Sequence, residues 1–157
     1  MNEYYVTNRD VIKNFALNTG TSANPTFTKS CTFTDLALNM DFETQDFSVF
    51  CDAIRRSIKT GVALTLEGTV KIDINNLAIQ KVIGDIQALI TAGTISQFNN
   101  QLVQFELLTG VNNSVLEYTK YQVSVSYSLE AMGGNAEDVS EFAITMTING
   151  TGTEISA

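Results

Sequence analysis

The chain has 157 residues and carries 17 acidic against 9 basic side chains, for a net charge of −8. This length suits one domain that buries a core without disulfide or metal support, and the negative charge repels nucleic-acid phosphate, which argues against a sequence-reading DNA-binding protein. Histidine, the usual general base near neutral pH and the commonest metal ligand, is absent, which removes serine–histidine and cysteine–histidine catalysis and most zinc sites.

The first residues, Met1–Tyr5, lack the basic and apolar regions of a secretion signal, and no apolar run is long enough to cross a bilayer. We therefore expect a soluble protein that is made in a cytoplasm and has no membrane partner. Cys31 and Cys51 are expected to stay reduced in that compartment.

Residues 1–19 contain apolar side chains without a clean period, and a turn-rich run follows them. We expect an irregular strand or arm here and then a loop. From Thr26 apolar residues alternate, but their phase shifts by one position between Phe33 and Leu36. Such a shift predicts a β-bulge or bend near Asp35.

Residues 41–60 mix apolar and charged side chains, so a loop, a helical turn and a short strand all remain open, and we treat this segment as a long loop. Residues 62–74 form the cleanest strand pattern, with an apolar side chain at every second position except Gly68. At about 3.3 Å per residue this strand would span roughly 40 Å, which is long for a compact domain.

A helix is predicted from an N-cap at Asn75 or Asn76 to about Ala92, with Gly93 as its stop signal. Its apolar residues recur at helical spacing and form one stripe: Leu77, Val82, Ile83, Ile86, Leu89 and Ile90. The same asparagines, together with Asp73, resemble the start of a calcium-binding loop. The glycine and distal glutamate of that motif do not follow, so helix capping is the simpler interpretation.

Residues 102–108 alternate as a strand, and after a turn over 110–114 two longer strands follow, over 118–132 and 139–150, joined by a glycine turn. Each long strand has one apolar face and one face of serine, threonine, glutamine or glutamate. The predicted fold is therefore mainly β, an α+β variant: a single domain, 1–157, built as an antiparallel β-sandwich or half-barrel with one flanking α-helix.

Motifs that would carry chemistry are weak in this chain. Gly133-Gly134 and Gly150-Thr-Gly152 lack the lysine and the following helix of a phosphate-binding loop. Neighbouring acids such as Glu137 and Asp138 are usually solvated turn residues rather than an acid–base pair. We therefore predict no catalytic residue, no cofactor and no metal site, and we do not expect an enzyme.

The polar strand faces lack the lysine-rich coat of a free-living soluble domain. Only 17% of the residues are charged, which is below the usual quarter. A surface of this kind suits a subunit that is buried among neighbours, and those neighbours are most simply copies of the same chain.

Four stretches together resemble the tail tube proteins of long-tailed bacteriophages. They are residues 26–33, GVALTLEGTVKID over 61–73 before a single helix, and YQVSVSYSLE over 121–130 with EFAITMTING over 141–150 across a glycine turn. The resemblance spans most of the chain and rests on patterns of strand and turn. It implies a β-sandwich or barrel with a flanking helix, six copies closed into a ring, and rings stacked into a tube that conducts DNA during ejection.

The resemblance also implies partners and a location. The partners would be the chain itself, in stacked hexameric rings, and other tail proteins such as the tape measure, tail tip and terminator. The protein would be made in the bacterial host cytoplasm and reside in the virion tail, and DNA would pass without specific binding. Six copies carry about −48 per ring, and a negative wall keeps DNA sliding. The candidate lumen acids are Glu67, Asp73, Glu106 and Glu130.

Tail tube proteins use a long loop and terminal arms to reach the next ring, and residues 41–59 and 1–19 match those segments in position. The candidate subunit contacts are then Phe47, Val49, Phe50, Ile54, Arg55 and Arg56. An ordinary core segment stays open as the alternative interpretation of the apolar members. The Arg55-Arg56 doublet suits a solvated loop or an ion pair with an acidic neighbouring subunit.

Two other functions remain as alternatives. The inner tube of a contractile injection particle or bacteriocin would use the same fold. A non-catalytic ligand-binding or adhesive β-sandwich module belongs to another class, and it predicts a secretion signal and exposed aromatic residues. Tryptophan is absent, which weakens that prediction.

Overall fold

The computed structural model describes residues 5–21, 23–30, 32–49, 52–130 and 132–155. Seven strands form one antiparallel sheet in the order β2-β1-β5-β6-β7-β4-β3. The strands are β1 (Ile12–Asn18), β2 (Phe27–Lys29), β3 (Phe33–Val49), β4 (Asp52–Lys71), β5 (Gln101–Asn112), β6 (Val115–Leu129) and β7 (Glu141–Ile155). The helices are α1 (Leu77–Ala92), the short α2 (Ser96–Asn99) and a 3₁₀ turn (Asn8–Asp10).

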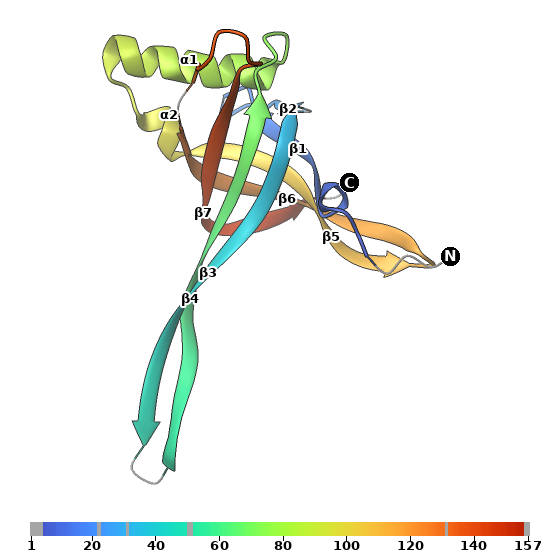
Figure 1. Cartoon of the computed structure of the whole chain (residues 1–157), viewed down its shortest axis with the longest axis vertical. Helices are drawn as coiled ribbons and strands as arrows, with labels where there is room; N and C mark the ends of the chain where they lie inside the picture. The colour runs from blue at the N-terminus through green and yellow to red at the C-terminus, as the bar shows by residue number, and fades with distance from the viewer. Residues whose placement is uncertain (1–4, 22, 31, 50–51, 131, 156–157) are drawn as a thin grey trace.

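The sheet is strongly twisted and curved, so β5 and β6 cross the direction of β3, β4 and β7 (Figure 1). Helix α1 lies across one end of the strands. This arrangement is the half-barrel form of the predicted fold, mainly β with one principal helix. The predicted fold class is confirmed.

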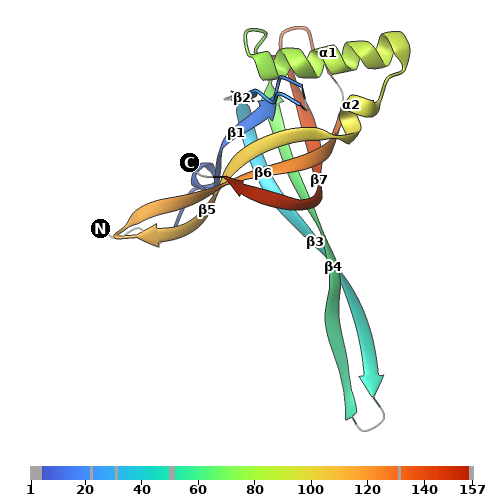
Figure 2. The same cartoon turned by 180° about the vertical axis from the view of Figure 1, so that it is seen from behind.

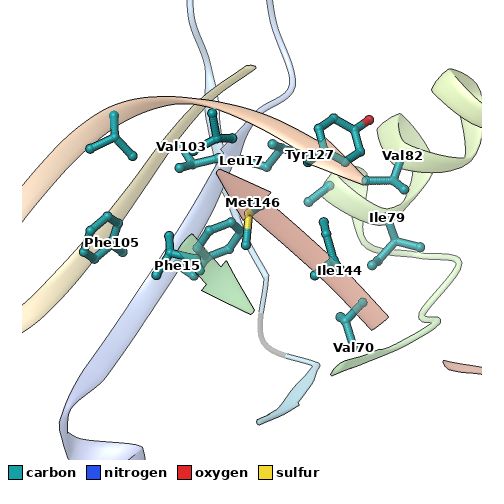
Figure 3. Packing of buried hydrophobic residues seen from close by; sticks show 14 of the residues in the cluster. Phe15, Leu17, Val70, Ile79, Val82, Val103, Phe105, Tyr127, Ile144 and Met146 are labelled. Carbon is teal, nitrogen blue, oxygen red and sulfur yellow. The ribbon is translucent and has the colours of Figure 1, made fainter. Parts of the chain in front are cut away.

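The core lies on the concave side of the sheet, where alternate residues of five strands meet α1. Figure 3 shows Phe15, Met146 and Ile144 converging with the side chains of α1. The buried cluster comprises Ile12, Phe15, Leu17, Leu66, Val70, Ala78, Ile79, Val82, Val103, Phe105, Val123, Val125, Tyr127, Phe142, Ile144 and Met146. The predicted alternation of the two C-terminal strands therefore has its apolar face in the core.

Helix α1 begins and ends where the sequence predicts. The Asn76 side chain accepts hydrogen bonds from the backbone N–H groups of Ala78 (2.9 Å) and Ile79 (3.4 Å), and Gly93 takes the left-handed conformation with φ of 64°. The predicted apolar stripe needs correction, because Ala78, Ile79, Val82 and Asp85 are buried. Three of its predicted members are instead exposed: Leu77 (56%), Leu89 (41%) and Ile90 (78%).

Two predicted boundaries need correction. Of the irregular strand or arm expected over residues 1–19, residues 12–18 form the strand, because β1 pairs with β2 and β5 and buries Phe15 and Leu17 in the core. The sequence period is hidden by an irregularity: Asn14 has a positive φ of 55° and the register shifts between Lys13 and Ala16. Two core residues, Ile12 and Phe15, are therefore three positions apart instead of two.

Residues 41–49 and 52–60 are not a loop. They belong to β3 and β4, which pair almost continuously from Phe33↔Val70 to Val49↔Asp52. The predicted bulge near Asp35 is confirmed, since the register shifts between Phe33 and Asp35. The glycine turn after β6 is also longer than expected, because β6 ends at Leu129 and β7 begins only at Glu141.

Candidate assembly surfaces

The most prominent surface is a protruding two-stranded ribbon. Strand β4 pairs with β7 only from Thr65 to Lys71, so the part of the β3–β4 hairpin beyond this point has no third strand. We call residues 40–49 and 52–62 the arm. At about 3.3 Å per residue the arm extends roughly 30 Å from the body, and both views show it leaving the rest of the chain (Figures 1 and 2).

The arm exposes large apolar side chains on both faces. No residue is inserted along β3 from Asp35 to Phe47, since the register shift between Glu43 and Thr44 skips Thr60 of β4, so Phe42 and Phe47 lie on opposite faces. Near the body, Phe42 pairs with Val62, and farther out Phe47 pairs with Arg56. The exposed large apolar residues of the arm are Met40 (59%), Phe42 (48%), Phe47 (39%), Val49 (47%), Ile54 (72%), Ile58 (50%) and Val62 (48%).

Five of the predicted contact residues are placed on this arm. Phe47, Val49 and Ile54 are exposed, as are Arg55 and Arg56. Phe50 lies outside the described residues. The alternative that this segment is ordinary core is therefore wrong for the described apolar members, while their role as subunit contacts stays a prediction.

A second hairpin projects sideways. The turn between β5 and β6 is formed by Asn113 and Ser114, which have positive φ values of 51° and 65°, as a tight two-residue hairpin turn requires. Beside it Val111 and Val115 are 64% and 65% exposed. We call residues 109–118 the lateral hairpin, and Figure 2 shows it pointing away from the body at a wide angle to the arm. The sequence predicted no role for this hairpin, although the valines that flank its Asn-Ser turn were the available signal.

An apolar groove of about 450 Å³ opens between the helices and the end of β6. It is lined by Ile86, Leu89, Ile95, Phe98, Asn99, Tyr127, Ser128, Leu129, Glu130 and Met132. Ile95 is 59% exposed and Met132 is 44% exposed. We call this surface the groove. The sequence could not reveal it, because its lining comes from segment 86–99 and from 127–130 with Met132, which only the fold brings together.

The four predicted lumen acids do not gather at one place. Glu67 is exposed on the sheet face opposite the core and pairs with Ala37 and Thr145. Glu106 lies at the other side of the sheet, between Lys13 and Lys120 in register. On β6, Ser128 pairs with Thr145, the partner of Glu67, and Lys120 pairs with Glu106. Ser128 and Lys120 are eight residues apart along β6, which is roughly 26 Å.

The remaining contacts of these acids also differ. Glu106 is half-buried and accepts a hydrogen bond from Asn14 Nδ2 at 2.6 Å. Asp73 accepts a hydrogen bond from the Asn75 backbone N–H at 3.0 Å, in the turn that leads into α1. Glu130 is exposed at the rim of the groove. Two of the four acids, Glu67 and Glu106, lie on strands of the sheet. Of these two, only Glu67 has no lysine paired directly across from it.

Among the described residues, no group of three or more histidine, cysteine, aspartate or glutamate side chains is arranged to hold a metal ion. No described helix is both long enough and apolar enough to cross a membrane.

No protein-family model matches the chain, and no curated protein sequence matches it either. Solved structures do. The SPP1 tail tube protein superposes with a TM-score of 0.61 at 14% identity, over 92% of this chain and 76% of that one. A tail chain of the empty GTA particle gives a TM-score of 0.60 at 9% identity, over 97% of this chain and 100% of the other. The chain has the tail-tube fold.

A solved structure from a contractile injection system is also similar to this chain. A chain of the sheath–tube complex of the PVC extracellular contractile injection system gives a TM-score of 0.52 at 12% identity, over 90% of this chain and 89% of that one. With identities this low, the likeness lies in the course of the strands rather than in particular side chains. The resemblance that the strand and turn patterns predicted is thus confirmed at the level of the fold.

Proposed function

We propose that this chain is a structural, non-catalytic subunit that assembles with copies of itself into hexameric rings, and that the rings stack into a phage tail tube. The arm carries this proposal. An isolated two-stranded ribbon is marginal in water, and this one exposes seven large apolar side chains. A partner that covers the arm stabilises it, and the tail-tube fold favours another copy of the chain as that partner.

The proposed ring uses the lateral hairpin and the stack uses the arm. The GTA tail with the same fold was refined with C6 symmetry, which supports six subunits in a ring. Closed rings also cover the open edges of the sheet, which are otherwise sites of uncontrolled pairing. The tape measure, tail tip and terminator are the proposed further partners, and the virion tail is the proposed location after synthesis in the host cytoplasm.

The polar sheet face supports a role as a DNA conduit. Cross-strand rows on this face read Thr65, Thr147 and Ser126, and next to them Glu67, Thr145 and Ser128. Within these two rows there is no cation to bind phosphate, and a ring of six Glu67 carboxylates repels it. We therefore propose this face as the lumen wall, with Glu67 as its principal acid.

An inner tube of a contractile injection particle is the second candidate function. The similarity to the PVC sheath–tube complex favours it. The subunit chemistry would be the same, but the outer wall of the tube would bind a sheath. Co-expression with sheath proteins encoded beside this chain, followed by co-purification, distinguishes the two tubes.

The test of the proposed function is negative-stain electron microscopy with light scattering across a concentration series. The wild-type protein is expected to form rings and tubes with an open channel. Phe47→Asp places a charge on the arm and is expected to remain folded but to stop before tubes form. Leu77→Asp is the matched control, because Leu77 is exposed (56%) in the first turn of α1, away from the arm. A wild-type protein that stays monomeric at every concentration would favour the ligand-binding module instead.

A further inference from the structure

The arm and the groove lie at opposite ends of the molecule. In both views the arm ends at one extreme of the long axis, while α1, α2 and the β6–β7 connection lie at the other (Figures 1 and 2). If a patch at one end binds a different patch at the other end of a second copy, the contact is heterologous and repeats without closing. This geometry suits growth along an axis.

The two surfaces match in polarity. The outer part of the arm presents Phe47, Val49, Ile54 and Ile58, all at least 39% exposed. The groove presents Leu89, Ile95 and Met132, which are also exposed. Burying these side chains against each other removes apolar area from water on both partners, which is the main favourable term in association.

The two surfaces also differ in charge. Three of the nine basic residues of the chain, Arg55, Arg56 and Lys59, fall within five positions on the β4 strand of the arm, where residues 54–62 hold no acid, whereas the β3 strand of the arm carries Asp41, Glu43 and Asp46. No lysine or arginine occurs in residues 121–157. Glu130 stands at the groove rim, and the β6–β7 connection that follows it carries Glu137 and Asp138. The basic β4 strand of the arm approaching an acidic groove is electrostatically favoured.

The lateral hairpin is the competing apolar occupant from the same chain. It exposes Val111 and Val115, but its charged residue is Glu117, and no lysine or arginine occurs in residues 109–118. An acidic hairpin in an acidic groove brings like charges together, which costs binding energy. The arm, unlike the lateral hairpin, offers cations to the groove, and this difference selects the arm.

We propose that the groove formed by α1, α2 and the end of β6 is the docking site for the arm of a second copy of this chain in the adjoining ring. The outer apolar residues of the arm enter the groove, and Arg55 faces Glu130 at its rim. The inference rests on the proposed tube function and names the receptor surface for the arm. A copy thus offers an arm at one end and a groove at the other, so each ring continues the stack.

The first test places acids in the groove. Ile95 and Met132 are 59% and 44% exposed, so the variant Ile95→Asp/Met132→Asp is expected to fold, as judged by circular dichroism. It should stop at single rings in sedimentation velocity and electron microscopy. The control is Ile90→Asp, because Ile90 is 78% exposed on the same helix but does not line the groove; this variant should form tubes like the wild type.

The second test reverses the proposed charge pair. Arg55→Glu and Glu130→Lys should each raise the critical concentration for tube growth roughly tenfold, and the double reversal should lower it again. Tubes from a folded groove variant at wild-type concentration would overturn the inference and leave the proposed function intact. If the groove variant does not fold, the charge pair decides. The inference is then overturned when Arg55→Glu/Glu130→Lys does not lower the critical concentration again. A wild-type protein that never assembles would overturn the proposed function itself.

Discussion

The Tyr127 hydroxyl donates a hydrogen bond to Asp85 Oδ2, and this bond joins strand β6 to helix α1. Both side chains are buried, at 6% and 9% exposure. Lys81 Nζ lies 3.3 Å from Asp85 Oδ1 on the same helix, and the Phe98 ring packs 4.8 Å from the Tyr127 ring, centroid to centroid. One tyrosine therefore fixes α1 and α2 against the sheet, and with them the walls of the groove.

Removal of that hydroxyl should destabilise the fold. Tyr127→Phe leaves a buried carboxylate with one fewer donor, and hydrogen bonds to charged groups contribute about 1.5–3 kcal/mol. We expect a loss of that size in the free energy of unfolding, measured by urea denaturation under conditions where the protein is monomeric. Tyr121→Phe is the control, because no hydrogen bond from its hydroxyl occurs within the described residues, and its cost should stay within about 0.5 kcal/mol. Equal losses in the two variants would contradict this role.

The same bond should make stability depend on alkaline pH. Burial raises the pKa of Tyr127 above the ordinary tyrosine value, and the hydrogen bond to Asp85 and the charge of Asp85 raise it further. Above about pH 10 the tyrosine ionises in the unfolded chain, whereas the folded chain keeps the proton, so the unfolded state binds fewer protons. This contribution to stability is fully present below pH 10 and falls by up to about 1.4 kcal/mol per pH unit above it.

The measurement is the difference in unfolding free energy between the wild type and Tyr127→Phe from pH 8.5 to 11. Since the phenylalanine variant has no proton to lose at this position, the wild-type advantage should shrink as the pH rises above 10. A constant difference over that range would show that the tyrosine does not hold its proton in the fold.

Gly68 should be intolerant of any side chain. A Cβ at this position would lie 2.6 Å from the Asp35 carbonyl oxygen and 2.9 Å from Cδ1 of Phe33, at the bulge in the pairing of β3 with β4. Gly68→Ala forces this bulge apart, and overpacking of that kind costs about 1–3 kcal/mol.

Gly84 provides the opposite case. It lies inside α1, and a Cβ there meets no atom within 4 Å among the described residues. Gly84→Ala should stabilise the protein by about 0.5–1 kcal/mol, because alanine is the better helix former. Thermal unfolding of the two variants side by side tests both signs, and a stable Gly68→Ala protein would mean that the bulge can yield.

What the sequence predicted and what it missed divide along physical lines. The ends of α1 were predictable because Asn76 and Gly93 act locally, through hydrogen bonds and a left-handed turn within a few residues. The bulge near Asp35 was predictable because β3 has one half-buried face there, so a shift of register appears as a shift of apolar phase.

The arm was missed for the opposite reason. Beyond Glu43 the ribbon has two exposed faces, so no face selects apolar residues and the period-two signal disappears. Strand β1 was expected only as an irregular strand or arm, because Asn14 interrupts its alternation. The groove depends on contacts between segments about forty residues apart, such as Tyr127 with Asp85, and no local pattern encodes such a contact.

The lateral hairpin should control ring closure rather than stacking. Val111 and Val115 flank its tip and are 64% and 65% exposed, so Val111→Asp/Val115→Asp should leave the monomer folded. If the hairpin contacts the neighbouring subunit in the same ring, this variant should remain monomeric in sedimentation velocity, whereas Phe47→Asp should stop at rings. Lys120→Ala nearby is a control for a general effect of the β6 surface. Rings formed by the valine variant would exclude the lateral hairpin as the ring contact. A Phe47→Asp protein that remains monomeric would show instead that the arm takes part in ring closure, because its loss would then block the step before stacking.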